Sequence, residues 1–149
     1  MIKKLIKLSF IAIAIYFFSC SSLKSKEILF RESQNYFVKN SFKTEQIVSK
    51  KITSQLELNN FFGSATVMGS NGKPTLIDFK KEFVVAVICP ETYFLSQLTS
   101  TRLIVSEDNV VNIEYKIINK EKQTYSTVPF YLMIVDNEYV NKDFVLKQY

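Results

Sequence analysis

The chain has 149 residues, a formal net charge of +5 and a hydrophobic content of 47%, which suits one domain with its own core. It contains no histidine and two cysteines, Cys20 and Cys89. The lack of histidine excludes Ser-His-Asp and Cys-His catalysis and nearly every common zinc site, and two cysteines cannot build a disulfide framework. We therefore expect a protein that is not an enzyme and that holds no metal and no cofactor.

The N-terminus has the pattern of an export signal. Three lysines lie within the first seven residues, and residues 8–18 are mostly apolar. A membrane-spanning helix needs about twenty apolar residues, so this run is too short to cross a bilayer. The small residue Ser19 precedes Cys20, and a polar run follows, which resembles a bacterial lipoprotein signal. The resemblance implies that Cys20 receives a diacylglyceryl group on its sulfur and becomes the new N-terminus.

Lipidation would divide the chain into a signal peptide (1–19), a lipidated cysteine with its tether (20–26) and one β-rich domain (27–149). Cleavage removes three lysines and leaves 16 basic against 14 acidic residues, a net charge of +2. We therefore expect no nucleic-acid partner, because such proteins usually carry a clustered basic face. The acyl chains would anchor the protein to a membrane of the cell envelope, the outer membrane by preference, facing the periplasm or the exterior.

One short helix is expected over residues 54–62. Ser54 is followed three residues later by Glu57, the spacing of a capping box. Leu58, Phe61 and Phe62 share one face, and Gly63 stands where a helix end favours glycine.

The three glycines all lie between residues 63 and 72, so unusual backbone conformations are easiest there. The segment Met68–Pro74 is expected to be a loop, either a plain connection or a binding loop held on a rigid scaffold. Its spacing fits no phosphate-binding motif. The candidate partner-binding residues are Gly69, Ser70, Asn71, Gly72 and Lys73.

The rest of the chain favours strands. Residues 83–89 are seven consecutive apolar residues, typical of a strand that is buried on both faces. Residues 111–118 largely alternate, as a half-buried strand does, and Pro129 interrupts the apolar run 124–135, which indicates an edge or bend. Further strands are expected over 28–31, 36–39, 75–79, 101–106 and 144–148, with turns over 107–109 and 119–123. The fold is therefore expected to be mainly β (α+β), a small antiparallel barrel or sandwich.

Two groups of side chains invite a catalytic interpretation. Cys89 could be a nucleophile, but it ends an apolar strand without a histidine base, so an inert core thiol is favoured. Asp78, Glu82 and Glu91 flank the same strand and could act as acid and base on glycosides, although solvated turn charges are the better account. Aromatic residues enrich the C-terminal third, and most are expected in the core. These six are Tyr125, Phe130, Tyr131, Tyr139, Phe144 and Tyr149.

The order of features from residue 47 onward resembles small exported bacterial β-domains. The resemblance rests on segments 52–57, 74–79, 83–88, 127–130 and 144–146. This group includes the C-terminal domain of PrcB-type protease-complex subunits and small lipoproteins of gut and oral bacteria that restrain secreted proteases. It implies a non-catalytic envelope protein that binds a protein partner, such as a secreted protease, by loop occlusion. A second candidate loop holds Glu91, Thr92 and Tyr93. The alternatives are an assembly or adhesion lipoprotein that binds through a sheet edge and, last, a carboxylate-dependent hydrolase.

Overall fold

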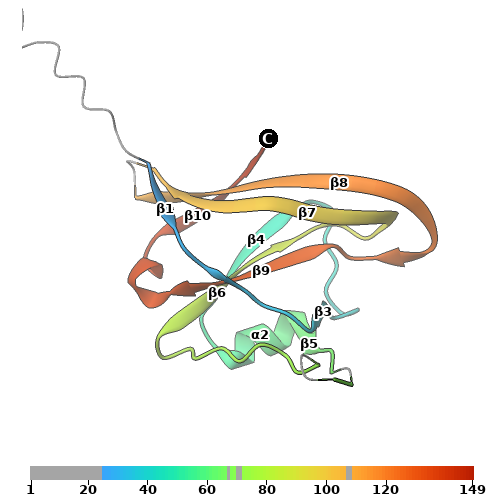
Figure 1. Ribbon diagram of the computed structural model, residues 1–149, viewed down its shortest axis with the longest axis horizontal. Helices are drawn as coiled ribbons and strands as arrows, with labels where there is room; N and C mark the ends of the chain where they lie inside the picture. Colours follow the sequence, from blue (N-terminus) through green and yellow to red (C-terminus); the bar gives the residue numbers. More distant parts are fainter. Residues whose placement is uncertain (1–24, 67, 70–71, 107–108) are drawn as a thin grey trace, which may run out of the picture.

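Two four-stranded sheets lie face to face and form the body of the molecule (Figure 1). The computed structural model describes residues 25–66, 68–69, 72–106 and 109–149.

Sheet A has the order β1-β7-β8-β10, sheet B the order β2-β9-β6-β4, and β3 pairs with β5 in a small third sheet. Sheet A comprises β1 (Lys26–Ile28), β7 (Thr92–Val105), β8 (Val110–Thr127) and β10 (Asp143–Gln148). Sheet B comprises β2 (Arg31–Glu32), β9 (Phe130–Asp136), β6 (Glu82–Ile88) and β4 (Val48–Ile52). The remaining elements are β3 (Tyr36–Val38), α2 (Gln55–Phe61), β5 (Phe62–Ser64) and η2 (Asn137–Tyr139). The expected mainly β fold, a small barrel or sandwich with one short helix, is confirmed.

Strand β6 is the centre of the core, and its residues from Phe83 to Ile88 are buried, as is Cys89 just beyond it. Because side chains alternate along a strand, they supply two different layers. Phe83, Val85 and Val87 face the cluster between the two sheets, whereas Val84, Ala86 and Ile88 face a second cluster under α2 and the small sheet. The prediction of a strand buried on both faces is therefore confirmed.

A single long two-stranded ribbon, folded over on itself, links the two sheets. β6 pairs with β9 in sheet B, and their continuations β7 and β8 pair in sheet A. The fold-over lies at Pro90 and Pro129, where the backbone N–H of Cys89 donates to the carbonyl of Pro129 at 2.9 Å. Proline donates no backbone hydrogen bond, so it suits a point where the ladder stops. The predicted bend at Pro129 is this corner.

The helix begins as the sequence predicts and ends one residue earlier than expected. The Ser54 hydroxyl accepts from the Glu57 N–H at 3.2 Å, and the Glu57 carboxylate accepts from the Thr53 N–H at 2.7 Å. Phe62 is already extended, and Gly63 lies in β5 opposite Phe37. The expectation that Gly63 serves as the helix C-cap glycine is wrong, because strand pairing with β3 takes over at that point.

Three local strand assignments are corrected by the tertiary pairing. Residues 75–79 are not a strand, because Thr75 bonds to Gln34 and Tyr36 without starting a ladder. Residues 119–123 are not a turn, because β8 continues through them to Thr127 against β7. The sequence analysis also missed β4, whose partner β6 satisfies its backbone groups.

The last strand, β10, confirms the strand expected over 144–148 but runs parallel to β8. The expectation of a purely antiparallel sheet is therefore wrong at this one pair. After β9 the chain passes through η2 and crosses from sheet B to sheet A, where β10 lies beside β8. A crossover of this kind allows β10 to run parallel to β8.

Candidate functional site

The predicted loop of Glu91, Thr92 and Tyr93 lies at the fold-over corner. The expectation of a loop is wrong for Thr92 and Tyr93, because they begin β7, where Thr92 pairs with Thr127. Glu91 follows Pro90 directly, and its carboxylate accepts a hydrogen bond from Lys43 at 2.7 Å and another from the Ser126 hydroxyl. The hydrogen bond from Lys43 lowers the pKa of Glu91 most, and the hydrogen bond from Ser126 adds to this effect. The carboxylate therefore stays charged at pH values where an ordinary glutamate would take up a proton. Three segments of the chain therefore meet at one fixed anion.

An exposed apolar run leaves the corner along β7. Tyr93, Phe94 and Leu95 are 55%, 43% and 43% exposed. The Phe94 N–H donates to the Thr92 hydroxyl at 3.2 Å, and the Ser96 hydroxyl donates to the Phe94 carbonyl at 3.2 Å. These local hydrogen bonds hold the backbone that carries the run. Three neighbouring apolar side chains on a held backbone are typical of a contact surface.

The corner is hollowed on several sides. One hollow of about 630 Å³ lies between β7 and the β8–β9 connection, and Leu95, Leu98 and Pro129 contribute to its wall. A second, of about 290 Å³, and a third, of about 160 Å³, both reach Pro90 and Glu91. The corner therefore combines concave surface with the exposed run.

Cys89 lies at the base of this corner and is buried. Burial raises the pKa of its thiol to about 11, so the thiol is neutral near pH 7. This agrees with the interpretation of Cys89 as a core residue, because a reactive cysteine needs a lowered pKa.

The glycine loop is held from behind by the segment before β3. The Asn35 amide donates to the Lys73 carbonyl at 2.9 Å, and the Asn35 carbonyl accepts from the Ala65 N–H at 2.8 Å. Gly69 is exposed with a φ of +124°, which favours glycine, and Met68 is fully exposed. Lys73 is exposed, whereas Gly72 is buried and donates to the Gly69 carbonyl at 3.2 Å. The predicted residues Ser70 and Asn71 lie outside the described residues.

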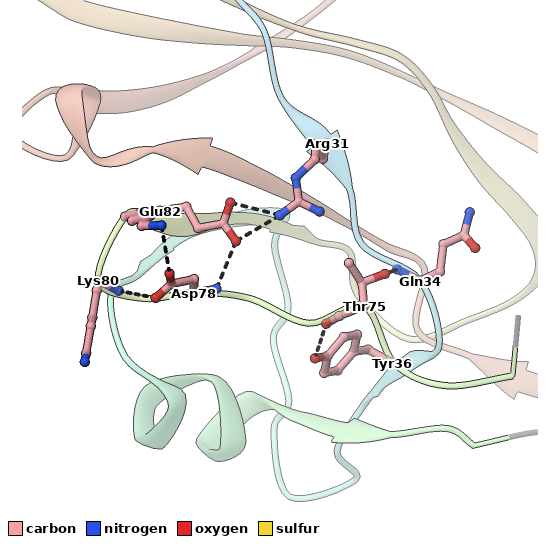
Figure 2. A network of polar contacts seen from close by, with 8 residues as sticks. Arg31, Gln34, Tyr36, Thr75, Asp78, Lys80 and Glu82 are labelled. Atoms are coloured by element: carbon pink, nitrogen blue, oxygen red, sulfur yellow. Dashed lines mark hydrogen bonds and ion pairs between the residues drawn. The ribbon is translucent and has the colours of Figure 1, made fainter.

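The carboxylates Asp78 and Glu82 belong to a polar network that joins β2 to the start of β6 (Figure 2). Glu82 accepts from Arg31 with both oxygens at 2.9 Å and from the Asp78 N–H at 2.9 Å. Asp78 accepts from the Lys80 N–H at 3.1 Å, as a turn residue does. These contacts give both carboxylates a structural role. A separate contact in the same view does not involve the carboxylates: the Tyr36 hydroxyl donates to the Thr75 carbonyl at 2.9 Å.

The third candidate carboxylate, Glu91, lies beyond the opposite end of β6 from Glu82. Seven strand residues at about 3.3 Å each separate the two ends by about 20 Å. Paired carboxylates in glycosidases stand about 5–10 Å apart. The structure therefore does not bring Glu82 and Glu91 together as an acid and base pair.

The two predicted sites make their polar contacts with different segments: Glu91 bonds to Lys43 and Ser126, whereas Lys73 of the glycine loop bonds to Asn35. The sequence analysis missed Lys43 and Ser126, which are 48 and 35 residues from Glu91. A local sequence pattern does not predict side-chain contacts between residues so far apart along the chain.

The aromatic residues of the C-terminal third divide as expected. Phe130, Tyr131, Tyr139 and Phe144 pack half-buried against the two core clusters. Tyr125 and Tyr149 are 58% and 55% exposed. The prediction that most of this set belongs to the core is confirmed.

No family model, curated protein or solved structure matches this chain. Within the described ranges, no group of three or more cysteine and carboxylate side chains is placed to hold a metal ion. A helix long and apolar enough to cross a membrane is likewise not found in the described part of the chain. The predicted lipidation site, Cys20, lies outside that part. The functional assignment therefore rests on the residues of the chain itself.

Proposed function

We propose that this chain is a lipid-anchored protein of the bacterial cell envelope that binds a partner protein without catalysis. The single observation that carries the binding role is the exposed run Tyr93–Leu95 beside the fixed carboxylate of Glu91. Large apolar side chains at the centre of an interface contribute most of its binding free energy. The backbone that carries the run is already held, so its binding loses little conformational entropy.

The proposed anchor is a thioether-linked diacylglyceryl group on Cys20. The order of a basic segment, a short apolar run, Ser19 and Cys20 supports it. Five residues separate Cys20 from Lys26, and an extended chain spans at most about 3.6 Å per residue. The domain would therefore remain within about 20 Å of the membrane surface, and its partner would be met there.

The proposed partner is a secreted protease, and the proposed mechanism is occlusion of its substrate cleft. The corner offers both a protruding apolar run and a charged group that stays ionised. The glycine loop offers a second contact, with fully exposed Met68 and Gly69 at positive φ. Blocking a substrate cleft requires no general base, either at the corner or in the glycine loop.

Metabolic labelling with an alkyne-bearing fatty acid tests the anchor. The full chain is expected to incorporate the label and to partition into membranes. Cys20→Ala is expected to lose both properties, because the acyl group needs the Cys20 sulfur. Cys89→Ala serves as the matched control and should label as the wild type does. Equal labelling of wild type and Cys20→Ala would contradict the anchor.

Inhibition assays test the partner. The detergent-solubilised full chain is added to secreted serine, cysteine and metalloproteases of the source bacterium. The double variant Tyr93→Ala with Phe94→Ala should weaken inhibition of the partner protease at least tenfold, the loss expected from two interface anchors. The control is Leu56→Ala, which removes another exposed apolar side chain, on α2. If no protease is inhibited, or if both variants act alike, the assignment fails.

The second candidate function is assembly or adhesion through a sheet edge. One observation favours it: residues 92–101 of β7, which lie outside its pairing with β1, include no charged side chain. Recovery of envelope assembly components by the wild-type protein, without any protease, would favour this function.

A further inference from the structure

Most of strand β7 presents an open edge. Its pairing with β1 covers Leu103–Val105 alone, through the register from Ile28 to Lys26. In the part of the chain that the structure describes, β8 is the sole strand neighbour of the rest of β7. The ladder with β8 is regular over Ser96–Thr99, with irregularities before and after this stretch. Every second residue of this four-residue stretch therefore turns its backbone donor and acceptor away from β8, toward the open edge.

This edge lacks the protection that the other outer strands have. Charged residues on an edge strand discourage pairing with another chain. β1, β2, β4 and β10 each contain at least two charged residues. Residues 92–101 of β7 contain none, and they also lack proline and glycine. The irregularities of the ladder flank the regular stretch, Ser96–Thr99, and do not interrupt it.

A groove runs beside the open edge. The hollow of about 630 Å³ is lined by β7 from Leu95 to Thr99 and by the β8–β9 connection with Phe130 and Tyr131. A strand added at the β7 edge would place alternate side chains over this groove. Apolar side chains fit there, since Leu95, Leu98 and Phe130 contribute to the wall.

The charge of the groove sets one more requirement for the segment that could bind there. Glu32 is the one charged residue among the groove's described lining residues. It lies on β2 beside Tyr131, and its presence there adds to the effect of burial in raising the pKa of that tyrosine. A carboxylate at the end of an otherwise neutral groove favours a basic side chain in the occupant and disfavours an acidic one.

We propose that the open edge of β7 binds an extended peptide segment of the partner protein by strand addition, antiparallel to β7, with apolar side chains at alternate positions and one basic side chain at Glu32. Strand β1 already occupies the same edge of β7 in this direction, so the peptide continues its line. The proposal deepens the proposed protein-binding function, which it presupposes. It assigns the segment of the partner that is recognised.

Peptide selection tests the proposal on the full chain in detergent. A phage-displayed library of random eight-residue peptides is panned against the wild-type protein. The expected sequences carry apolar residues at alternate positions and one Lys or Arg. If no peptide is enriched, or if the enriched peptides show helical spacing or acidic residues, the proposal is overturned.

Backbone methylation of a selected peptide tests the pairing itself and leaves the protein unchanged. Two versions are made, with N-methyl groups on either of the two alternate sets of amides. One set should lose at least tenfold in affinity, because its N–H groups pair with β7, and the other should stay within about threefold. Equal loss in both sets, or none in either, contradicts strand addition. Amide hydrogen exchange should slow at Ser96–Thr99 when the peptide binds.

Two further measurements test the charge and the occupant. Glu32→Gln should weaken the binding of a Lys-bearing peptide about threefold or more, while Glu45→Gln, which lies outside the groove, should leave it unchanged. Light scattering reports the mass of the protein. A dimer whose Ser96–Thr99 amides are already protected would show a second copy as the occupant and overturn the proposal. Peptide binding depends neither on the lipid nor on any protease, so its failure is distinguishable from failure of the proposed function.

Discussion

The buried thiol of Cys89 makes the stability of the domain depend on pH. Burial raises its pKa from 9.0 to about 11, so the folded state holds the proton more tightly than the unfolded chain does. This contribution is fully present below pH 9 and is lost as the pH rises to 11. We expect the free energy of unfolding of the wild type to fall over this window by on the order of 2 kcal/mol more than that of Cys89→Ala.

Urea denaturation of both proteins at pH 8, 9, 10 and 11 measures this difference. Tyr36 and Tyr131, whose pKa burial raises, are common to both proteins and cancel. Tyr115 cancels only in part, because Cys89 adds to the effect of burial in raising its pKa. A parallel fall in the two proteins would show that the thiol does not titrate as described.

Two buried hydroxyls are expected to lower the stability of the domain. The Oγ atom of Ser33 and the Oγ1 atom of Thr101 are buried and have no hydrogen-bond partner among the described residues. A buried polar group without a partner costs about 1–3 kcal/mol. Ser33→Ala and Thr101→Val should therefore each raise the free energy of unfolding by about 1 kcal/mol, as measured by urea denaturation. The control is Ser54→Ala, which removes a hydroxyl that caps α2 and should lower stability by about 1 kcal/mol.

At the scale of elements, the pairing of β3 with β5 depends on a close contact between Phe37 and Gly63. The two residues stand opposite each other, and a Cβ atom added at Gly63 would lie 2.3 Å from the Phe37 ring. Gly63→Ala must therefore displace the ring, at a cost of about 1 kcal/mol in stability. In a Phe37→Ala background the same substitution should cost nearly nothing, because the clashing atoms are gone.

A double-mutant cycle of the four proteins measures this coupling by thermal or urea denaturation. An equal cost of Gly63→Ala in both backgrounds would mean that backbone conformation, and not the Phe37 ring, requires glycine there.

At the scale of the whole molecule, β6 joins two core clusters into one cooperative unit. Leu103 belongs to the cluster between the sheets and Leu58 to the cluster under the helix, and both are fully buried. Leu103→Ala and Leu58→Ala should each lower the free energy of unfolding by about 3 kcal/mol. Because every layer packs on β6, each variant should keep a single transition.

Far-UV circular dichroism and tyrosine fluorescence, followed through urea denaturation, check this prediction. The two signals should coincide in the wild type and in both variants. If Leu58→Ala separates them, the layer of α2 and the small sheet unfolds on its own.

The features that the sequence predicted correctly depend on neighbours along the chain. The apolar run 83–89 predicts burial on both faces because no polar side chain is present to face water. The Ser54 and Glu57 spacing predicts the helix start because a capping box closes within four residues. The same local logic identified Pro129 as a break. It failed at 119–123, where polar residues continue a strand because β7 pairs with them.

The candidate site was predictable in part. The segment Glu91–Tyr93 was singled out, and the uncharged stretch 92–101 was visible in the sequence. The partners Lys43 and Ser126, the groove beside β7 and the ion pair of Arg31 with Glu82 were not.

The sequence alone thus determined the two-faced central strand, the capped helix and the mainly β class, because each follows from the chemistry of adjacent residues. Only the tertiary structure decided the fold-over at Pro90 and Pro129, the open edge of β7 and the anchoring of Glu91. The fold-over and the anchoring of Glu91 join residues that are 35 or more positions apart, as Cys89 and Pro129 or Glu91 and Ser126 are. Such contacts depend on how the two sheets pack, which no local pattern encodes.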